Sequence, residues 1–228
     1  MTLDRLKDVV PWGRPFDEYV SMFNLSSTDL NRTILDCGAG PSSFTAEANV
    51  RGGRVVACDP LYRFSAGEIS ARIDGTYPVM VAGMEPARDR FVWTWAGSPS
   101  RHAERRLEAM RRFLADFPVG SRAGRYVTGA LPALPFADNS FDLTLTSHFL
   151  FLYSEHLSLQ FHLAAIDEML RIASQVRIFP LLDLAGERSA HLQPIMTESK
   201  RRSFEPRIVT VPYKFQRGGN QYLQIDRP

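Results

Sequence analysis

The chain has 228 residues, and 27 basic against 25 acidic side chains give a formal net charge of +2. With 44% hydrophobic and 23% charged residues, its composition is globular, which excludes long disorder, collagen-like repeats and a disulfide scaffold. No apolar run approaches the ~20 residues of a membrane helix, and residues 1–10 lack the apolar stretch of a signal peptide. Its two cysteines fall in predicted buried strands, which fits a reducing compartment, so we expect a cytoplasmic protein.

Strands and helices alternate along most of the chain. Strands are predicted where short apolar runs end at turn residues, and helices where apolar residues recur every three to four positions. In chain order, the predicted elements are strand 33–37, helix 42–49, strand 54–58, helix 65–73, helix 100–117, strand 126–128, strand 141–147, helix 158–173, and strands 176–182, 207–215 and 221–225. This order predicts an α/β fold with a doubly wound, mostly parallel sheet that finishes in a C-terminal antiparallel hairpin.

One long segment interrupts the alternation. The stretch between helix 65–73 and strand 126–128 is too long for a simple connection. We interpret residues 77–125 as an inserted helical and aromatic cap within a single domain of residues 1–228, with an N-terminal helical segment over residues 1–30. The aromatic residues of the insert either stack on a flat ligand or form a small core that holds the cap. Its Arg-rich helix is typical of a solvated face, and His102 on it is expected at the surface, as is His191.

The strongest signal is the sequence DCGAGPSS at positions 36–43 together with Asp59. Glycine at positions 38 and 40 lets the backbone turn tightly and approach a ligand closely. An acid about twenty residues further on, at the tip of the next strand, suits hydrogen bonds to a ribose diol. The alternative interpretation is a turn without a ligand and an aspartate at the surface.

Two features distinguish this loop from one that binds a dinucleotide. Asp36 would repel a pyrophosphate but suits a cationic amino-acid group, and Pro41 lacks the N–H that a phosphate needs. The expected ligand therefore carries adenosine without a diphosphate, a description that S-adenosylmethionine (SAM) meets. A short-chain nicotinamide dehydrogenase is excluded, because none of the lysines, at positions 7, 200 and 214, follows a tyrosine by four residues.

Three stretches carry a resemblance to a known superfamily. ILDCGAG at 34–40 resembles motif I of the class I SAM-dependent methyltransferases, VVACD at 55–59 resembles their second motif, and LPFADNSFDL at 134–143 is similar to their approach to strand four. The resemblance covers residues 33–180, and the C-terminal hairpin matches the reversed last strand of the superfamily. It implies a Rossmann-like fold, SAM as cofactor and S-adenosylhomocysteine as product.

The resemblance also implies a cofactor site at the strand ends. The residues expected there are Asp36 near the amino group, Gly38, Ala39 and Gly40 along the methionine part, Asp59 on the ribose, Pro60 and Leu61 beside the adenine, Ala130 and Leu131 near the same ring, and Ser147 near the sulfonium. Many members carry an aspartate for the adenine amine where Gly129, Ala130 and Leu131 stand. Here that contact must come from the backbone or from elsewhere in the chain.

Candidates for the chemistry lie around the end of strand 141–147. His148 is the candidate catalytic residue, either as a base or as a contact to the acceptor, and the alternative is a hydrogen-bonded wall residue. Arg14 and Tyr19 are candidate substrate residues that would reach the cofactor's carboxylate if the N-terminal segment folds over the site. Trp93 and Trp95 are the candidates within the insert. No metal site is expected, because the cysteines and histidines lack ligand spacing.

We therefore expect SAM-dependent methyl transfer to a small-molecule acceptor by in-line displacement. One alternative is a non-catalytic SAM-binding or scaffold protein, which would keep the cofactor residues without turnover. A second is an RNA methyltransferase. Nucleic acid is the less favoured partner because TSHF stands at 146–149, where a base-amino methyltransferase would carry an Asn/Asp-Pro-Pro-aromatic motif. No basic stripe is long enough to follow a duplex, and no membrane partner is expected.

Overall fold

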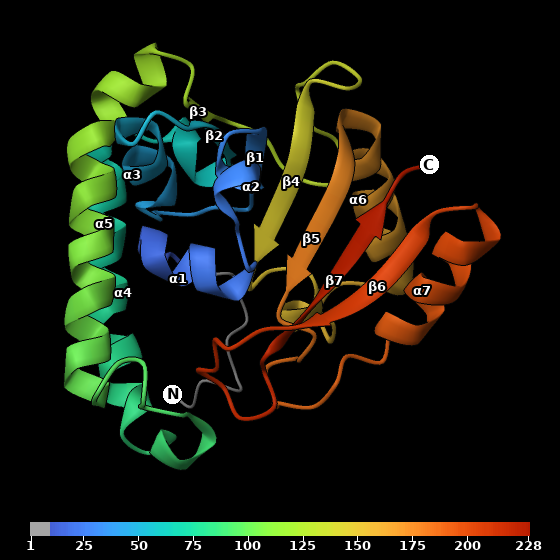
Figure 1. The fold of residues 1–228 in the computed structure, drawn as a ribbon. Helices are drawn as coiled ribbons and strands as arrows, with labels where there is room; N and C mark the ends of the chain where they lie inside the picture. The colour runs from blue at the N-terminus through green and yellow to red at the C-terminus, as the bar shows by residue number, and fades with distance from the viewer. Residues whose placement is uncertain (1–9) are drawn as a thin grey trace.

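The computed structural model describes residues 10–228, so the first part of the expected N-terminal segment, residues 1–9, lies outside the described residues. The centre of the molecule is a seven-stranded sheet in the order β3-β2-β1-β4-β5-β7-β6. In Figure 1 the arrows of β4 and β5 point to the same lower edge of the sheet, and β7 runs the opposite way. Among residues 10–228, no helix combines the length and the apolarity needed to cross a membrane.

The strands confirm the predicted sheet. Their bounds are Thr33–Cys37 for β1, Arg54–Cys58 for β2, Tyr126–Val127 for β3, Phe141–Ser147 for β4, Ala173–Phe179 for β5, Glu205–Thr210 for β6 and Gln221–Asp226 for β7. β1 to β5 pair in parallel, and β7 is antiparallel to both of its neighbours, which confirms the mostly parallel sheet and the terminal hairpin. β6 ends before the predicted position 215, and Pro212, which has no backbone N–H for a ladder, stands just beyond its end.

The described residues contain seven α-helices and three short 3₁₀ turns, of which α1 and α2 precede β1. The helices are α1 (Phe16–Met22), α2 (Ser27–Leu30), α3 (Phe44–Val50), α4 (Ala66–Met84), α5 (Pro99–Arg122), α6 (Leu159–Ile172) and α7 (Leu192–Arg201). The 3₁₀ turns are η2 (Pro60–Arg63), η3 (Arg88–Arg90) and η4 (Phe151–Tyr153). α7 was not predicted.

Helix α4 begins where predicted but is much longer than predicted. Ser65 and Glu68 form the expected capping box. The predicted end near Ile73 is wrong, because the buried side of the helix continues through Met80 to Met84. These buried positions keep helical spacing. Their packing stabilises the helix on both sides of Pro78, although the proline lacks the backbone N–H for one helical hydrogen bond.

The segment expected as a cap, residues 77–125, consists of the end of α4, the connection with η3, and α5. Met110, Phe113 and Phe117 of α5 are buried in one cluster with Ala57 of β2, so this half of the helix covers the sheet edge. The connection between α4 and α5 instead reaches the loop between β6 and β7, where Phe91 pairs with Gln216 (Figure 1).

Hydrophobic cores on the two faces of the sheet hold the strands in place. On one face, α6 buries Ala165 and Met169 against Val176 of β5. On the other, Tyr19 of α1 and Phe44 of α3 pack in the cluster that contains Leu143 and Leu145 of β4, and the two aromatic rings are stacked 4.4 Å apart. Apolar burial on both faces holds the parallel strands together, and in sheets of this kind ligand sites lie at the carboxyl ends of the strands.

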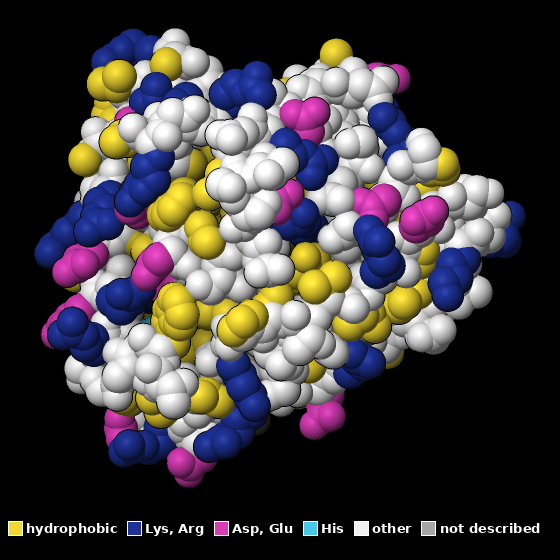
Figure 2. All heavy atoms as spheres, viewed as in Figure 1, with side chains coloured by type: hydrophobic (Ala, Val, Ile, Leu, Met, Phe, Trp, Pro, Cys, Tyr) yellow, Lys and Arg dark blue, Asp and Glu magenta, His cyan; other side chains and the backbone are white. Residues whose placement is uncertain are grey.

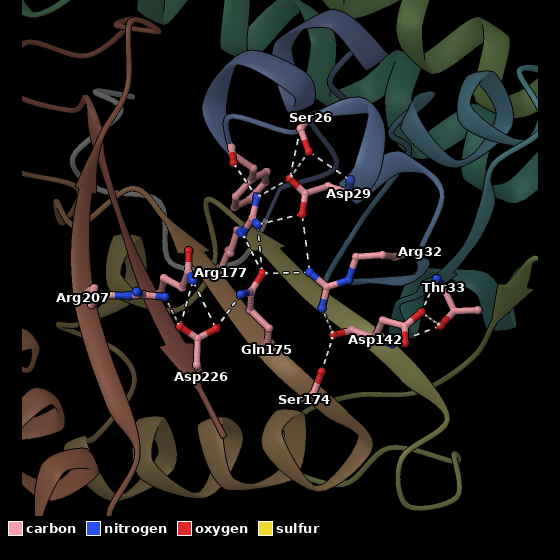
Figure 3. A network of polar contacts seen from close by, with 12 residues as sticks. Ser26, Asp29, Arg32, Thr33, Asp142, Ser174, Gln175, Arg177, Arg207 and Asp226 are labelled. Carbon is pink, nitrogen blue, oxygen red and sulfur yellow. Dashed lines mark hydrogen bonds and ion pairs between the residues drawn. The ribbon is translucent and has the colours of Figure 1, made fainter. Parts of the chain in front are cut away.

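A polar network ties α2 to the sheet (Figure 3). Arg177 of β5 donates from Nη2 to Oδ1 of Asp29 at 2.9 Å, from Nη1 to the Phe23 carbonyl at 2.9 Å, and from Nε to Gln175 at 3.1 Å. Arg32 donates to the same Gln175 oxygen at 3.2 Å. Because the guanidinium of Arg177 is satisfied by these partners, we assign the network a structural role.

Candidate functional site

Two adjoining cavities lie at the carboxyl ends of the parallel strands. Cavity A, of about 160 Å³, extends from the loop after β1 to η3 and the loop between β6 and β7, and cavity B, of about 500 Å³, extends from the same loop to η2 and residues 129–131. The residues that line both are Val10, Gly38, Gly40, Asp59 and Phe149. The glycine loop is therefore the boundary between the two cavities, as expected for a ligand site at strand ends.

The glycine loop has the backbone geometry that its sequence predicts. Gly38 and Gly40 have φ of +68° and +55°, a conformation that side chains with a Cβ rarely adopt. The Gly38 N–H donates to the carbonyl of Cys58 at 2.8 Å, and a Cβ at Gly38 would lie 3.4 Å from the ring of Phe149. The Tyr62 hydroxyl donates to the Gly40 carbonyl at 2.7 Å. The loop is thus held on both sides while the backbone remains open to the cavities.

Asp59 stands at the shared wall with its carboxylate fixed by backbone. Oδ2 accepts from the Gly40 N–H at 2.9 Å, and Oδ1 accepts from the Leu61 N–H at 2.7 Å. Burial raises the pKa of this carboxyl, and the two backbone hydrogen bonds oppose the rise. A carboxylate oxygen has two acceptor sites. Each oxygen therefore keeps one site for a hydroxyl group of a ligand.

Asp36 lies at the end of β1 and is fully buried. Its Oδ1 accepts from the Tyr19 hydroxyl at 3.2 Å, and its Oδ2 has no partner among residues 10–228. Burial, with a smaller contribution from Asp59, raises the pKa of Asp36 to about 8, against the effects of Tyr19 and Arg14. Asp36 lines neither cavity, but its donor Tyr19 lines cavity A.

Arg14 brings a cation with unused donors to cavity A. Its Nη1 donates to the Trp12 carbonyl at 3.3 Å, and its buried Nε has no partner among the described residues. Burial and the nearby Arg106 lower the pKa of Arg14 to about 10, so the guanidinium is charged at neutral pH. A buried cation of this kind calls for an anionic partner.

His148 follows β4 in a left-handed conformation, with φ of +53°. Such a conformation is uncommon for a non-glycine residue and occurs often at functional sites. Its N–H donates to the Phe179 carbonyl at 2.6 Å, and its Nδ1 lies 2.9 Å from the Ser147 hydroxyl oxygen. Burial, together with Arg14 and Arg106, lowers its pKa well below the usual value, so the ring is neutral at pH 7.

The sequence did not indicate the buried ion pair that supports cavity A. Nη2 of Arg106 contacts Oε2 of Glu18 at 2.7 Å, and that oxygen also accepts from the Tyr213 hydroxyl at 3.1 Å. Arg106 donates from Nε to Nε2 of His102 at 3.2 Å. The prediction that His102 is a surface residue is wrong, because its ring is 1% exposed and stacks on Phe215 at 4.1 Å. The i, i+4 spacing of His102 and Arg106 was the available signal.

Most predicted site residues line the two cavities. Those that line cavity A, cavity B or both are Gly38, Ala39, Gly40, Asp59, Pro60, Leu61, Ala130, Leu131, Ser147 and His148, with Arg14 and Tyr19 of the N-terminal segment. Trp93 and Trp95 line neither cavity. Trp93 packs against Phe215 at 5.5 Å and is half-buried, and Trp95 packs against Tyr213 at 5.6 Å but is 40% exposed, so neither ring belongs to a buried core.

The strand order and the reversed β7 match the Rossmann-like fold of the class I SAM-dependent methyltransferases. The chain belongs to the family of the uncharacterized protein MJ0045 of Methanocaldococcus jannaschii, with 36% identity over 223 residues, which cover 97% of this chain and 98% of that protein. A search for family models found no match.

Solved structures with a similar fold include the magnesium protoporphyrin IX methyltransferase ChlM from Synechocystis PCC 6803 with bound SAM, at 12% identity and a TM-score of 0.48 over 93% of this chain and 78% of ChlM. Another is a putative RNA methyltransferase, PH1948 from Pyrococcus horikoshii, at 11% identity and a TM-score of 0.43 over 92% of this chain and 79% of that one. Within residues 10–228, no three His, Cys, Asp or Glu side chains gather as a metal site would require.

Proposed function

We propose that this protein is a SAM-dependent methyltransferase for a small-molecule acceptor, with the adenosine of SAM in cavity B and the acceptor in cavity A. The observation that carries the proposal is the meeting of both cavities at the glycine loop, with Asp59 in the shared wall. A ligand that reaches from one cavity to the other must pass the bare backbone of Gly38 and Gly40. The reacting atoms would meet beside Ser147 and His148, which line cavity A.

The residues present fit SAM group by group. Asp59 has acceptor sites for the ribose hydroxyls. Asp36 lies behind Tyr19 in the wall of cavity A with its Oδ2 unpartnered, and a cationic amino group bound nearby would favour the ionised form of this carboxyl. Arg14 has unused donors for the carboxylate. Leu61 and Leu131 line cavity B and offer apolar contact to the adenine. Each polar group of the ligand thus has a counterpart that is otherwise unsatisfied or only partly used.

When bound, SAM supplies a methyl group on a sulfonium whose leaving group is neutral. The protein's own contribution is alignment and exclusion of water, which together are worth about 7–11 kcal/mol at best. His148 is neutral and can accept a hydrogen bond or a proton from the acceptor, while Ser147 fixes its ring. His148 is therefore the proposed catalytic residue.

A small acceptor is favoured over nucleic acid by the charge balance of the surface. Figure 2 shows dark blue Lys and Arg spheres along the margin formed by α5, with magenta acidic spheres among them. On that helix Arg105 pairs with Asp17, and Arg112 pairs with Glu47. Because acidic partners neutralise part of this surface, it does not present the continuous basic stripe that a nucleic-acid backbone needs.

Calorimetry with SAM, S-adenosylhomocysteine and NAD tests the proposal. We expect both sulfur ligands to bind the wild-type protein, and Asp59→Ala to weaken that binding about tenfold or more through the lost ribose contacts. Asp74→Ala, an exposed acid of α4, is the matched control and should change nothing. Binding of NAD without binding of either sulfur ligand would reject the cofactor.

The non-catalytic alternative needs a separate experiment. The protein is incubated with SAM and a pool of small metabolites, and release of S-adenosylhomocysteine is measured. Release that requires a component of the pool supports the enzyme. Tight SAM binding with no release in small-molecule or RNA pools would support a scaffold instead, and release with RNA alone would support an RNA methyltransferase.

A further inference from the structure

The tautomer of His102 follows from its contact with Arg106. A guanidinium has donors only, so the Arg106 Nε–H must donate and Nε2 of His102 must accept at 3.2 Å. A neutral imidazole has one donor and one acceptor nitrogen, which puts the ring proton on Nδ1. Nδ1 has no hydrogen-bond partner among residues 10–228, and His102 lines cavity A. The Nδ1–H is therefore the ring donor that a molecule in the cavity can use.

Packing and charge keep this donor in place. The ring is stacked on Phe215, with 4.1 Å between centroids and 7° between planes. Arg106 cannot turn away, because it also contacts Glu18 at 2.7 Å and donates to the Gly13 carbonyl at 3.3 Å. Burial, with Arg106 and Arg14, lowers the pKa of His102 well below its usual value. The ring therefore stays neutral and keeps the same tautomer across the physiological pH range.

Beyond its boundary with cavity B, cavity A is suited to an anion with an apolar body that lies beside His102 and His148. Among the described residues, the acidic side chain that lines cavity A is Asp59, which stands at the boundary with cavity B. The walls beyond it include the apolar side chains of Met80, Met84 and Phe91. Among residues 10–228, an ammonium group there would find no acidic side chain in the wall beyond Asp59, whereas an anion would find His102 and the positive charges of Arg14 and Arg106.

The size of cavity A narrows the acceptor further. Its volume is about 160 Å³, close to that of an apolar protein cavity of about 150 Å³ that holds benzene. Because the methionine end of SAM would enter the same cavity beside Arg14, the acceptor is no larger than one ring. We propose that the methyl acceptor is a small, largely apolar oxygen acid, a carboxylate or phenolate about the size of one ring, whose anionic oxygen is bound by Nδ1–H of His102. This inference rests on the proposed methyl transfer and assigns the substrate class of the same site.

Methyl transfer to the anionic oxygen requires no proton transfer in the same step. A lone pair of the acceptor oxygen forms the bond to the methyl carbon, the carbon–sulfur bond breaks, and its electron pair stays on sulfur. The negative charge of the acceptor and the positive charge of the sulfonium cancel. A carboxylic acid or a phenol loses its proton to solvent before it binds, so no proton moves during methyl transfer.

Three ring compounds of similar size test the charge preference. Benzoate, benzyl alcohol and benzylamine are titrated by calorimetry into protein saturated with S-adenosylhomocysteine. We expect benzoate to bind at least about tenfold more tightly than the other two, because a hydrogen bond to a charged group exceeds one to a neutral group. Equal or tighter binding of benzylamine would overturn the proposal. If S-adenosylhomocysteine itself does not bind, the proposed function fails instead.

Two variants and one spectrum test the role of His102. His102→Phe keeps a ring to stack on Phe215 but removes the donor, so the benzoate preference should fall about tenfold while S-adenosylhomocysteine affinity is kept. His156→Phe, at an exposed position, should change neither. Retention of the full preference by His102→Phe would overturn the proposal.

If His102→Phe does not fold, nitrogen-15 NMR of the wild-type side chains decides the question. The proposal requires the Nδ1–H tautomer and a shift of that resonance when benzoate is added. The Nε2–H tautomer, or a resonance that benzoate does not move, would reject it.

Discussion

At the scale of a single residue, the buried Asp36 carboxyl lowers the stability of the ligand-free protein when it is ionised. Its carboxyl is fully buried, has one hydrogen-bond donor at 3.2 Å and leaves Oδ2 unpartnered among the described residues. The folded protein raises its pKa to about 8, from the value near 3.8 that an exposed aspartate has. The folded state therefore holds this proton more tightly than the unfolded state, and the contribution of Asp36 to stability falls as pH rises from about 4 to about 8.

Asp36→Asn should remove this pH dependence. The amide cannot ionise, so the variant should be more stable than wild type at pH 8, by an amount on the order of several kcal/mol. Urea unfolding at pH 6, 7 and 8 measures the difference. Wild-type stability that does not fall relative to the variant over this range would mean that Asp36 ionises normally.

The same substitution should weaken SAM binding in a pH-dependent way. A cationic ligand group favours the ionised carboxylate, so wild-type affinity should rise with pH until about 8 as less proton must be released. Groups of the ligand titrate equally with both proteins, and the difference between wild type and Asp36→Asn isolates this residue. Parallel curves for the two proteins would contradict the proposed contact.

His148→Ala should affect turnover more than cofactor affinity. His148 lies beside Ser147 at the end of β4, where the acceptor is proposed to meet the cofactor. Loss of the His148 ring removes a contact that positions the acceptor, and misplacement at the reacting atoms can cost about 10²-fold in rate, so we expect kcat to fall by that order while the Kd for SAM stays within about threefold. His156→Ala is the exposed control. An equal loss in both quantities would make His148 a wall residue.

At the scale of secondary structure elements, helix α2 is stabilised by its contacts with the sheet, because it is too short to be stable alone. It has four residues, too few to be stable alone, and Asp29 within it accepts from Arg177 of β5 (Figure 3). Ser26, the N-cap residue, and Asp29 form a capping box, in which each side chain accepts a hydrogen bond from the backbone N–H of the other residue. The network lies toward the amino ends of β4 and β5, away from the cavities. It attaches residues 23–29 to the sheet, and Arg14 and Tyr19 precede this stretch in the chain.

Asp29→Ala should destabilise the fold without altering the ligand site. It leaves the guanidinium of Arg177 buried without its charge partner, which costs about 3–5 kcal/mol in comparable pairs. Arg207→Gln breaks an exposed pair with Asp226 on the same sheet and should cost less than about 1 kcal/mol. Chemical unfolding compares the two, with SAM affinity measured beside it. Similar small losses would show that the pair contributes little.

For the whole molecule, the two cavities predict how ligands change stability. SAM should bind only the folded chain, so a concentration of 100 times its Kd adds about 2.7 kcal/mol. For a protein of this length that corresponds to a rise in Tm of about 5–10 °C. Thermal unfolding with SAM and with NAD at equal concentration provides the measurement. A rise with NAD alone would point to a dinucleotide in cavity B.

The sequence was sufficient for the sheet and for the glycine loop because both depend on local patterns. β1, β2 and β4 are short apolar runs with clear ends, and Gly38 and Asp59 are set by their distance from those ends. The burial of His102 depends on contacts with the loop between β6 and β7, more than one hundred residues away. Hydrophobic periodicity reflects only contacts between residues that are near in sequence. It could therefore not predict that His102 is part of the wall of cavity A.

Part of the wall of cavity A comes from two connections that contribute nothing to the glycine loop, the one between α4 and α5 and the one between β6 and β7. Phe91 of the first stacks on Phe215 of the second at 4.7 Å, and both line the cavity. Insertions or exchanges in these connections would remodel the wall while the strand tips around Gly38 and Asp59 stay unchanged. If the proposed function holds, sequence changes in these two connections would alter which acceptor is bound while the SAM site is kept, and they are the first stretches to randomise for a new selectivity.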